Sequence, residues 1–489
     1  MSNRGARHFA AVVIFFYGAV GAISGCAHTN RPPAADVSKS LPAKLEAPIF
    51  AYLGDFHRPI TTQVPLAQRY FDQGLALTYG FDYAEAARSF RAATIADPTC
   101  AICFWGLGLV LGSMNNTILS GHEQADAFAA ATSAQQAGGA ATDVERGLIH
   151  ALTLRYSKNT PTTSANEEPS CHQSSGVPKE ARETYAAAMR ALLDKYPQDA
   201  DVASIYAGSI FDLVDWEFWT ADRKPKAHTL ELGTALQTAL RANKNHIGLN
   251  HYYIHLMERS DHPEVGVPSA QRLSFLSPGL EHIVHMPSHV SATLGEYDAA
   301  VLTNERAARV FRGYKKECEL QGFTPVVNFL EQHNLHFLSW AAGMGGQSVR
   351  ALNSARDVVA LTLPLVDQEL TAQGFLTLPY FAHLRFEQWD ELLNEAGPKS
   401  EWPYANAMWH YARGVAHANL SQTADAEREH ATLLQIASEA KDGVSGVSGR
   451  DLKLMAIARA TLEAALARAK GDSALEISLL KQATELGSV

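Results

Sequence analysis

Two segments of the chain decide the fold: Asn250-His251-Tyr252-Tyr253-Ile254-His255 and, downstream, Glu281-His282-Ile283-Val284-His285-Met286-Pro287-Ser288-His289. Each segment holds two histidines four residues apart, and the second pair follows the first by 34 residues. A period of this length is typical of solenoids built from helical hairpins. Residues i and i+4 share one face of a helix, so the two pairs are predicted to meet across neighbouring helices and to bind one transition-metal ion.

The same period is clearest in residues 67–98. Small and aromatic residues there occupy the places where two antiparallel helices press together and then turn, namely Gly74, Ala86, Phe90, Ala93 and Pro98. Weaker matches continue to the end of the chain. The sequence therefore predicts helical hairpins over most of its length.

Over residues 67–489 the chain resembles tetratricopeptide-repeat (TPR) proteins. The resemblance implies an all-α fold, a right-handed solenoid of antiparallel helix pairs. The HYYIH and HMPSH segments are also similar to those of a group of bacterial TPR lipoproteins, a likeness that implies no particular reaction.

The repeat alignment starts successive units at Ile247 and Glu281. The resemblance implies that certain positions of each first helix line a concave groove. Those positions are occupied by His251, His255, Glu258, His282, His285 and His289. One repeat further on, His333 and His336 take equivalent positions, and we expect His336 to join the metal ligands.

A site made of imidazoles suits zinc, iron or copper rather than calcium or magnesium. Glu258 lies on the helical stripe of His251 and His255, so we expect it to act as a carboxylate ligand or as a catalytic general base on metal-bound water. The first histidine is not followed by the glutamate of HExxH zinc peptidases, which disfavours that class.

Two classes of function stay open. In the first, a groove metal is stored and handed on, or serves a metal-dependent oxidase, oxygenase or hydrolase. In the second, the chain is a non-enzymatic scaffold, whose groove binds a peptide or another envelope protein and whose histidines are polar groove residues. Metal retained after purification separates the two classes.

The amino terminus predicts the location. Arg4 and Arg7 precede an apolar run, residues 9–22, and Ile23-Ser24-Gly25-Cys26 follows, a pattern typical of a bacterial lipoprotein signal peptide over residues 1–25. Cys26 would carry the lipid and tether the chain on the periplasmic side of the cell envelope, with no other membrane contact. The alternatives are an ordinary secretory signal or an uncleaved anchor with a chance cysteine.

The expected domain organisation follows from changes in composition. It comprises a proline-rich linker (26–60), N-terminal repeats (61–156), a surface insertion (157–180), central repeats with the histidines (181–399) and C-terminal helical repeats or a cap (400–489). Cys100 and Cys103 form a CxxC, for which we expect a structural disulfide outside the cytosol, with metal binding or redox exchange as alternatives.

Composition excludes some partners. Hydrophobic residues make up 46% of the chain and charged residues 19%, so a folded core is expected. The formal net charge of −10 argues against nucleic acid, which requires a basic surface. The expected partners are a metal ion and an envelope protein or peptide.

Overall fold

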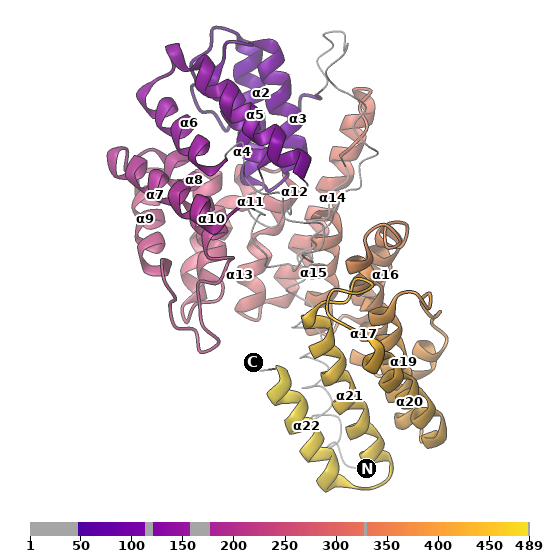
Figure 1. The fold of residues 1–489 in the computed structure, drawn as a ribbon. Helices are drawn as coiled ribbons and strands as arrows, with labels where there is room; N and C mark the ends of the chain where they lie inside the picture. Colours follow the sequence, from indigo (N-terminus) through magenta and orange to yellow (C-terminus); the bar gives the residue numbers. More distant parts are fainter. Residues whose placement is uncertain (1–46, 113–120, 157–176, 327–329, 488–489) are drawn as a thin grey trace. The chain divides into compact units, whose positions relative to one another are not determined.

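The computed structural model describes residues 47–112, 121–156, 177–326 and 330–487, and most of these residues lie in helices. Two isolated β-bridges, Trp219–Pro225 and Val444–Val447, are the only β pairing in the described residues. Consecutive helices pack against each other as antiparallel hairpins (Figure 1). The fold is therefore all-α and TPR-like, as the sequence predicts. Cys26, Cys171 and residues 157–176 of the expected insertion lie outside the described residues.

The chain divides into two compact units, and each is described here by itself. The N-terminal unit, whose described residues end at Glu331, contains α2 (Pro65–Tyr79), α3 (Tyr83–Ala96), α4 (Ala101–Leu111), α5 (Gly121–Ala137), η1 (Gly138–Ala140), α6 (Asp143–Arg155), α7 (Lys179–Lys195), α8 (Ala200–Leu213), α9 (Thr229–Ala242), α10 (Ile247–Met257), η2 (Pro263–Gly266), α11 (Val267–Leu276), α12 (Glu281–His285), α13 (Pro287–Thr293) and α14 (Tyr297–Leu320).

The C-terminal unit begins at Gln332 and contains α15 (Leu330–Met344, all but its first two residues), α16 (Ser348–Thr362), η3 (Leu370–Thr377), α17 (Leu378–Arg385), α18 (Trp389–Leu393), α19 (Pro403–Asn419), α20 (Thr423–Glu439), α21 (Gly449–Ala469) and α22 (Ser473–Gly487). The division falls inside residues 181–399, which the sequence analysis treats as one run of repeats. No helix in the described ranges combines the length and apolar character needed to cross a membrane.

The first hairpin, α2 and α3, follows the repeat pattern closely. A Cβ atom at Gly74 would lie 2.9 Å from the ring of Phe90, and one at Gly106 of α4 would lie 2.4 Å from the same ring. Glycine is therefore required where the three helices meet. The side chain of Asp82 caps α3 by accepting from the backbone N–H of Glu85.

The helices that carry the histidines begin where the repeat alignment starts them. α10 begins at Ile247 and α12 at Glu281. Pro287 has no backbone N–H, so the second helix is divided into α12 and α13, with Met286 in helical geometry between them. The rings of His285 and His289 still lie 4.8 Å apart across this break.

The inner face of the N-terminal unit is closed by its own first hairpin, because α2 packs against α10. Tyr79 at the end of α2 donates from its hydroxyl to Asp201 of α8 at 2.6 Å, and Arg58 donates to the same carboxylate at 2.6 Å. The Tyr79 ring also lies 5.1 Å from that of His246, the N-cap of α10. The groove expected at the histidines is thus filled by α2 and the turn after it.

Residues 47–60 differ from the free linker expected for residues 26–60. Gln73 of α2 accepts from the N–H of Phe50 at 2.9 Å and donates to the carbonyl of Pro48 at 2.9 Å. Gln321, just after α14, exchanges two hydrogen bonds of 3.0 Å with the backbone of Ile49. Proline-rich composition suggested a spacer, but apolar and amide partners far along the chain hold this segment as a strap, residues 47–64.

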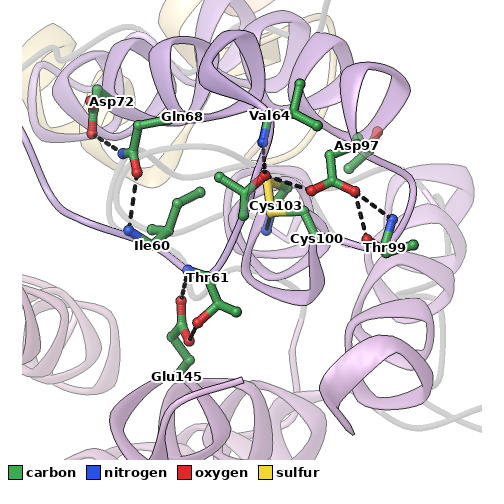
Figure 2. The surroundings of a disulfide bond; sticks show 12 residues. Ile60, Thr61, Val64, Gln68, Asp72, Asp97, Thr99, Cys100, Cys103 and Glu145 are labelled. Carbon is green, nitrogen blue, oxygen red and sulfur yellow. Dashed lines mark hydrogen bonds between the residues drawn. A yellow bond between two sulfur atoms is a disulfide. The ribbon is translucent and has the colours of Figure 1, made fainter. Parts of the chain in front are cut away.

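The strap continues past the Cys100–Cys103 disulfide, which joins the N-cap of α4 to its first turn (Figure 2). Figure 2 shows Thr61 of the strap donating to both carboxylate oxygens of Glu145, at 2.8 Å from its N–H and 2.6 Å from its hydroxyl. Thr62 donates to Asp97 at 2.5 Å. The disulfide therefore lies at the start of α4, beside the strap.

Candidate functional site

Five histidines of the N-terminal unit form a closed ring of imidazoles. Centroid distances between neighbours are 4.9 Å from His251 to His255, 4.9 Å from His255 to His289 and 4.8 Å from His289 to His285. The circuit closes through His282, which lies 5.4 Å from His285 and 5.0 Å from His251. The sequence-predicted pairs therefore do meet across α10, α12 and α13, and His282 joins them.

The ring is enclosed. His251 and His285 are 0% exposed and His282 is 5% exposed, and the side chains of His255 and His289 are 7% and 12% exposed. We expected these residues to line an open groove, and that expectation is wrong because α2 and the α2–α3 turn pack over them.

Two aromatic residues with left-handed backbone cover the ring. Phe81, at φ 59°, lies in the turn between α2 and α3, with its ring 4.3 Å from His251, 5.4 Å from His282 and 6.0 Å from His255. Trp216, at φ 65°, lies 6.0 Å from Phe81 and 5.0 Å from His255. Bulky residues rarely adopt positive φ, and such strain gathers at functional sites. Packing against the imidazoles holds both residues there.

Glu258 fixes two of the imidazoles. Its Oε1 lies 3.0 Å from Nδ1 of His255 and its Oε2 lies 2.5 Å from Nδ1 of His289. Burial by itself would raise the pKa of Glu258, but its interactions with His289 and His255 hold that pKa well below its usual range. The ionised carboxylate can only accept, so both Nδ1 atoms donate to it. Nδ1 of His251 likewise donates to the carbonyl of Tyr79, at 2.6 Å.

Asn304 of α14 fixes a fourth imidazole. Its amide Nδ2 donates to the carbonyl of Ala300 at 2.8 Å, which turns Oδ1 toward Nδ1 of His285 at 2.6 Å. Nδ1 of His285 therefore carries a hydrogen and donates, and the hydroxyl of Ser288 lies 3.2 Å from the same nitrogen. In four of the five imidazoles, therefore, Nδ1 already has an oxygen acceptor.

The Nε2 atoms of these four imidazoles are the distinctive feature of the site. The Nε2 atoms of His251 and His255 are buried and have no hydrogen-bond partner within the described residues. The Nε2 atoms of His285 and His289 lie 2.9 Å apart. Because both of these rings already donate from Nδ1, the two Nε2 lone pairs would repel each other unless a proton or a metal ion lies between them.

Burial keeps two rings neutral. It lowers the pKa of His251 well below its ordinary range, and the nearby His255 adds to the effect. Burial also lowers the pKa of His255, although the Glu258 carboxylate opposes it. A neutral imidazole is the form that binds a metal.

Within the N-terminal unit, two groups of three possible ligands converge. One is His251, His255 and His282; the other is His255, Glu258 and His289; within each group one ligand atom per residue lies within 4.8 Å of the others. Glu258, which the sequence predicts to be a carboxylate ligand or a general base, belongs to the second group. Its two oxygens accept from His255 and His289, as carboxylates that orient metal-bound histidines do.

His336 does not belong to the histidine ring of the N-terminal unit, although the sequence analysis expects it among the ligands. It lies on α15 in the C-terminal unit, 3% exposed, with its ring 5.7 Å from Phe375. Burial lowers its pKa to about 4 from 6.5, and Arg450 contributes. His336 is in none of the converging groups found in the described residues.

The depressed pKa of His336 predicts acid sensitivity of the C-terminal unit. The unfolded chain binds a proton at His336 more readily than the folded chain does. The contribution of neutral His336 to the free energy of unfolding is therefore fully present above pH 6.5 and is lost as the pH falls toward 4. We expect His336→Gln to flatten the pH dependence of unfolding by at most about 3 kcal/mol, measured by urea titration and hydrogen exchange of residues 332–487. His430→Gln, at a partly exposed histidine of the same unit, is the control, and an unchanged dependence in His336→Gln would contradict the assignment.

Sequence reasoning missed Asn304, Phe81 and Trp216 as parts of the site. Asn304 is 0% exposed and occupies the place in its repeat that Phe90 holds in the first hairpin. A polar residue at a core position is the signal that could have found it. Phe81 carries no such signal, because its role depends on the packing of α2 against α10.

Fold and site together define a TPR-like helical-repeat protein built around buried histidines. No family model matches the chain, and no curated protein matches its sequence. Similar solved structures include a human IFIT1 dimer with m7Gppp-AAAA (11% identity, 89% of this chain and 92% of that one, TM-score 0.36). Another is the Cut9–Hcn1 hetero-tetramer of APC/C, with 12% identity over 88% of this chain and 79% of that one and a TM-score of 0.31. A third is the P58(IPK) TPR domain, with 12% identity over 77% of this chain and 99% of that one and a TM-score of 0.18. TM-scores this low carry no argument about function, and the class rests on the helix pairs of the chain itself.

Proposed function

We propose that the N-terminal unit binds a transition-metal ion, zinc, iron or copper, through the imidazoles of α10, α12 and α13. The observation that carries this is the shared orientation of four rings: Nδ1 of His251, His255, His285 and His289 faces an oxygen acceptor, which leaves Nε2 for a metal. Metal-binding histidines nearly always donate their other ring N–H in this way.

The short distance of 2.9 Å between Nε2 of His285 and Nε2 of His289 supports the same proposal. This separation is shorter than twice a zinc–nitrogen bond of about 2.0–2.1 Å, so one ion can contact both. A shared proton would satisfy this one pair. It would leave the Nε2 atoms of His251 and His255 buried without a partner, and these two histidines form, with His282, one of the converging groups of possible ligands.

Different residues of the chain orient the imidazoles and exclude water from the site. Glu258, the carbonyl of Tyr79 and Asn304 orient the rings and keep each imidazole in one tautomer. Phe81 and Trp216 exclude water from one side. A bound metal would supply Lewis acidity or, for iron and copper, redox chemistry, which fits metal handling or a metal-dependent oxidase, oxygenase or hydrolase.

Elemental analysis of the chain, purified without chelator or histidine tag, tests the proposal. We expect near-equimolar zinc, iron or copper, and Co²⁺ added to the stripped chain should give the visible absorption of a nitrogen-ligated ion. Removing the metal should lower the thermal midpoint, because the ligand binds only the folded state. Absence of metal after reconstitution would favour the scaffold that binds an envelope protein or peptide.

Glu258 gives a finer test. Replacing Glu258 by Gln leaves one acceptor for two Nδ1 donors, so one imidazole loses its fixed tautomer. We expect metal affinity to fall roughly 10- to 100-fold, measured by competition with a chromophoric chelator. Glu264→Gln removes the carboxylate of an exposed histidine–glutamate pair, with His262, and should leave affinity unchanged. Equal affinities in the two variants would argue against the orienting role of Glu258.

We further propose that Cys26 anchors the chain by a lipid on the periplasmic side of the bacterial cell envelope, on the sequence pattern alone. The likeness of the HYYIH and HMPSH segments to those of bacterial TPR lipoproteins is in keeping with this location. Cys26→Ser is expected to move the chain from the membrane fraction to the soluble fraction or leave an uncleaved precursor. The same membrane association and mature mass in Cys26→Ser and in the parent would contradict lipidation.

A further inference from the structure

A pocket of about 500 Å³ opens on the N-terminal unit between the strap, α12 and α14. Its volume lies in the range of small-molecule sites. Most of its wall is apolar or aromatic, and its charged residues are Asp82, Glu281, Glu317 and Lys316. Three acids against one lysine favour a cationic occupant over an anionic one.

Two of those acids are buried. Asp82 and Glu281 are each 4% exposed, and Oε1 of Glu281 has no hydrogen-bond partner among the described residues. A buried carboxyl oxygen without a donor is costly, so a donor brought by a ligand would be stabilising.

Neighbouring donors are committed elsewhere. The hydroxyl of Tyr314, at the pocket wall, donates to Oε2 of Glu85 at 2.7 Å and accepts from the N–H of Val326 at 2.8 Å. Ala51 of the strap donates its N–H to Oε1 of Glu317 at 3.3 Å. Glu281, a residue of the pocket wall, thus has one carboxyl oxygen that no donor among the described residues satisfies.

The walls suit a hydrocarbon body next to a cation. The rings of Phe50 and Tyr314 lie 5.5 Å apart, and Tyr52 completes the aromatic lining. Tyr52 is 69% exposed and Leu320, also in the lining, is 77% exposed, so large apolar side chains stand at the mouth. Aromatic rings stabilise a neighbouring ammonium group and also shelter an apolar chain.

We propose that this pocket binds a small organic primary ammonium compound, with its –NH₃⁺ group at Glu281 and Asp82 and its hydrocarbon part between Phe50, Tyr52 and Leu320. A primary ammonium group is required because the unsatisfied oxygen of Glu281 needs a hydrogen-bond donor, which a quaternary ammonium lacks. The site uses different side chains from the histidine ring, so it does not rest on the proposed metal.

Calorimetric titration of the full chain with 2-phenylethylammonium tests the proposal. Excess chelator removes any metal, so this result and that of the elemental analysis are independent. We expect saturable one-to-one binding, with 2-phenylethanol and the N-trimethylated analogue each binding roughly 10- to 100-fold more weakly. No binding of 2-phenylethylammonium, or equal binding of the alcohol, would overturn the proposal.

Two variants then test whether the ligand binds at Glu281. Glu281→Gln keeps the shape of the side chain and should weaken 2-phenylethylammonium roughly 10- to 100-fold. Glu319→Gln, an exposed acid on α14 outside the pocket, changes the net charge equally and should have no effect. Circular dichroism and thermal melting check that both variants fold. Undiminished binding by folded Glu281→Gln would refute this location.

Discussion

A chain in which His285 and His289 are both replaced by glutamine is expected to purify without the metal that the parent retains. The two substitutions remove the pair of Nε2 atoms 2.9 Å apart and half of the four rings whose Nδ1 is held by an acceptor. The apparent binding free energy of structural zinc is about 10–16 kcal/mol, and most of such a binding energy is lost when two ligands are removed. Elemental analysis and the Co²⁺ spectrum measure the loss.

Glutamine is chosen because it is polar and close in size to histidine, so it limits the cavity and can still hydrogen-bond to Glu258 or Asn304. The control is His262→Gln, since the side chain of His262 is 74% exposed, lies in the same unit and pairs with exposed Glu264. If the double variant folds and keeps the parent's stoichiometric metal, the ion is bound elsewhere and the assignment to the histidine ring is wrong.

The largest expected loss of stability comes from Asp212→Ala. Asp212 accepts from Nη1 of Arg155 at 2.7 Å, and the two side chains are 3% and 0% exposed. The arginine also donates to the hydroxyl of Tyr156 at 3.1 Å. Removing the carboxylate leaves a buried guanidinium without its counter-charge, which typically costs about 3–5 kcal/mol of unfolding free energy. Urea unfolding of the full chain, followed by hydrogen exchange in α6 and α8, measures it.

The matched control is Glu183→Ala, which breaks an exposed pair with Lys179 at 3.8 Å and should leave stability unchanged within error. If Asp212→Ala does not fold, Asp212→Asn, which retains an acceptor, provides the measurement. Replacing both partners by apolar residues, Arg155→Met with Asp212→Leu, should recover much of the loss. If the free energy of unfolding of Asp212→Ala equals that of Glu183→Ala, the buried pair contributes little to stability.

Sequence reasoning found much of the local architecture because that part depends on short-range spacing. The repeat alignment put the starts of α10 and α12 at Ile247 and Glu281, where the structure has them. The i, i+4 spacing brought His285 and His289 together even across the break at Pro287. Because the hairpins repeat, residues at equivalent places in successive repeats occupy equivalent positions on their helices.

The spacing of residues in the sequence could not predict the hydrogen-bond partners of the imidazoles. Tyr79 lies 172 residues before His251, and the contact between them exists only because the first hairpin folds back onto α10. Asn304 occupies a position that the repeat pattern predicts to be apolar. Glu258, which helix geometry offers as a ligand or base, is turned by tertiary packing to accept from two rings at once.

By itself, the sequence determined an all-α chain of hairpins and the facing of two histidine pairs, since both follow from periodicity and helix geometry. Only the tertiary structure decided that the histidines are enclosed, that α2 fills the expected groove and that the strap packs onto α2 and α14. The physical reason is that burial and hydrogen-bond partners depend on contacts between residues far apart in the chain, and no local period encodes which distant side chain or carbonyl will be the neighbour.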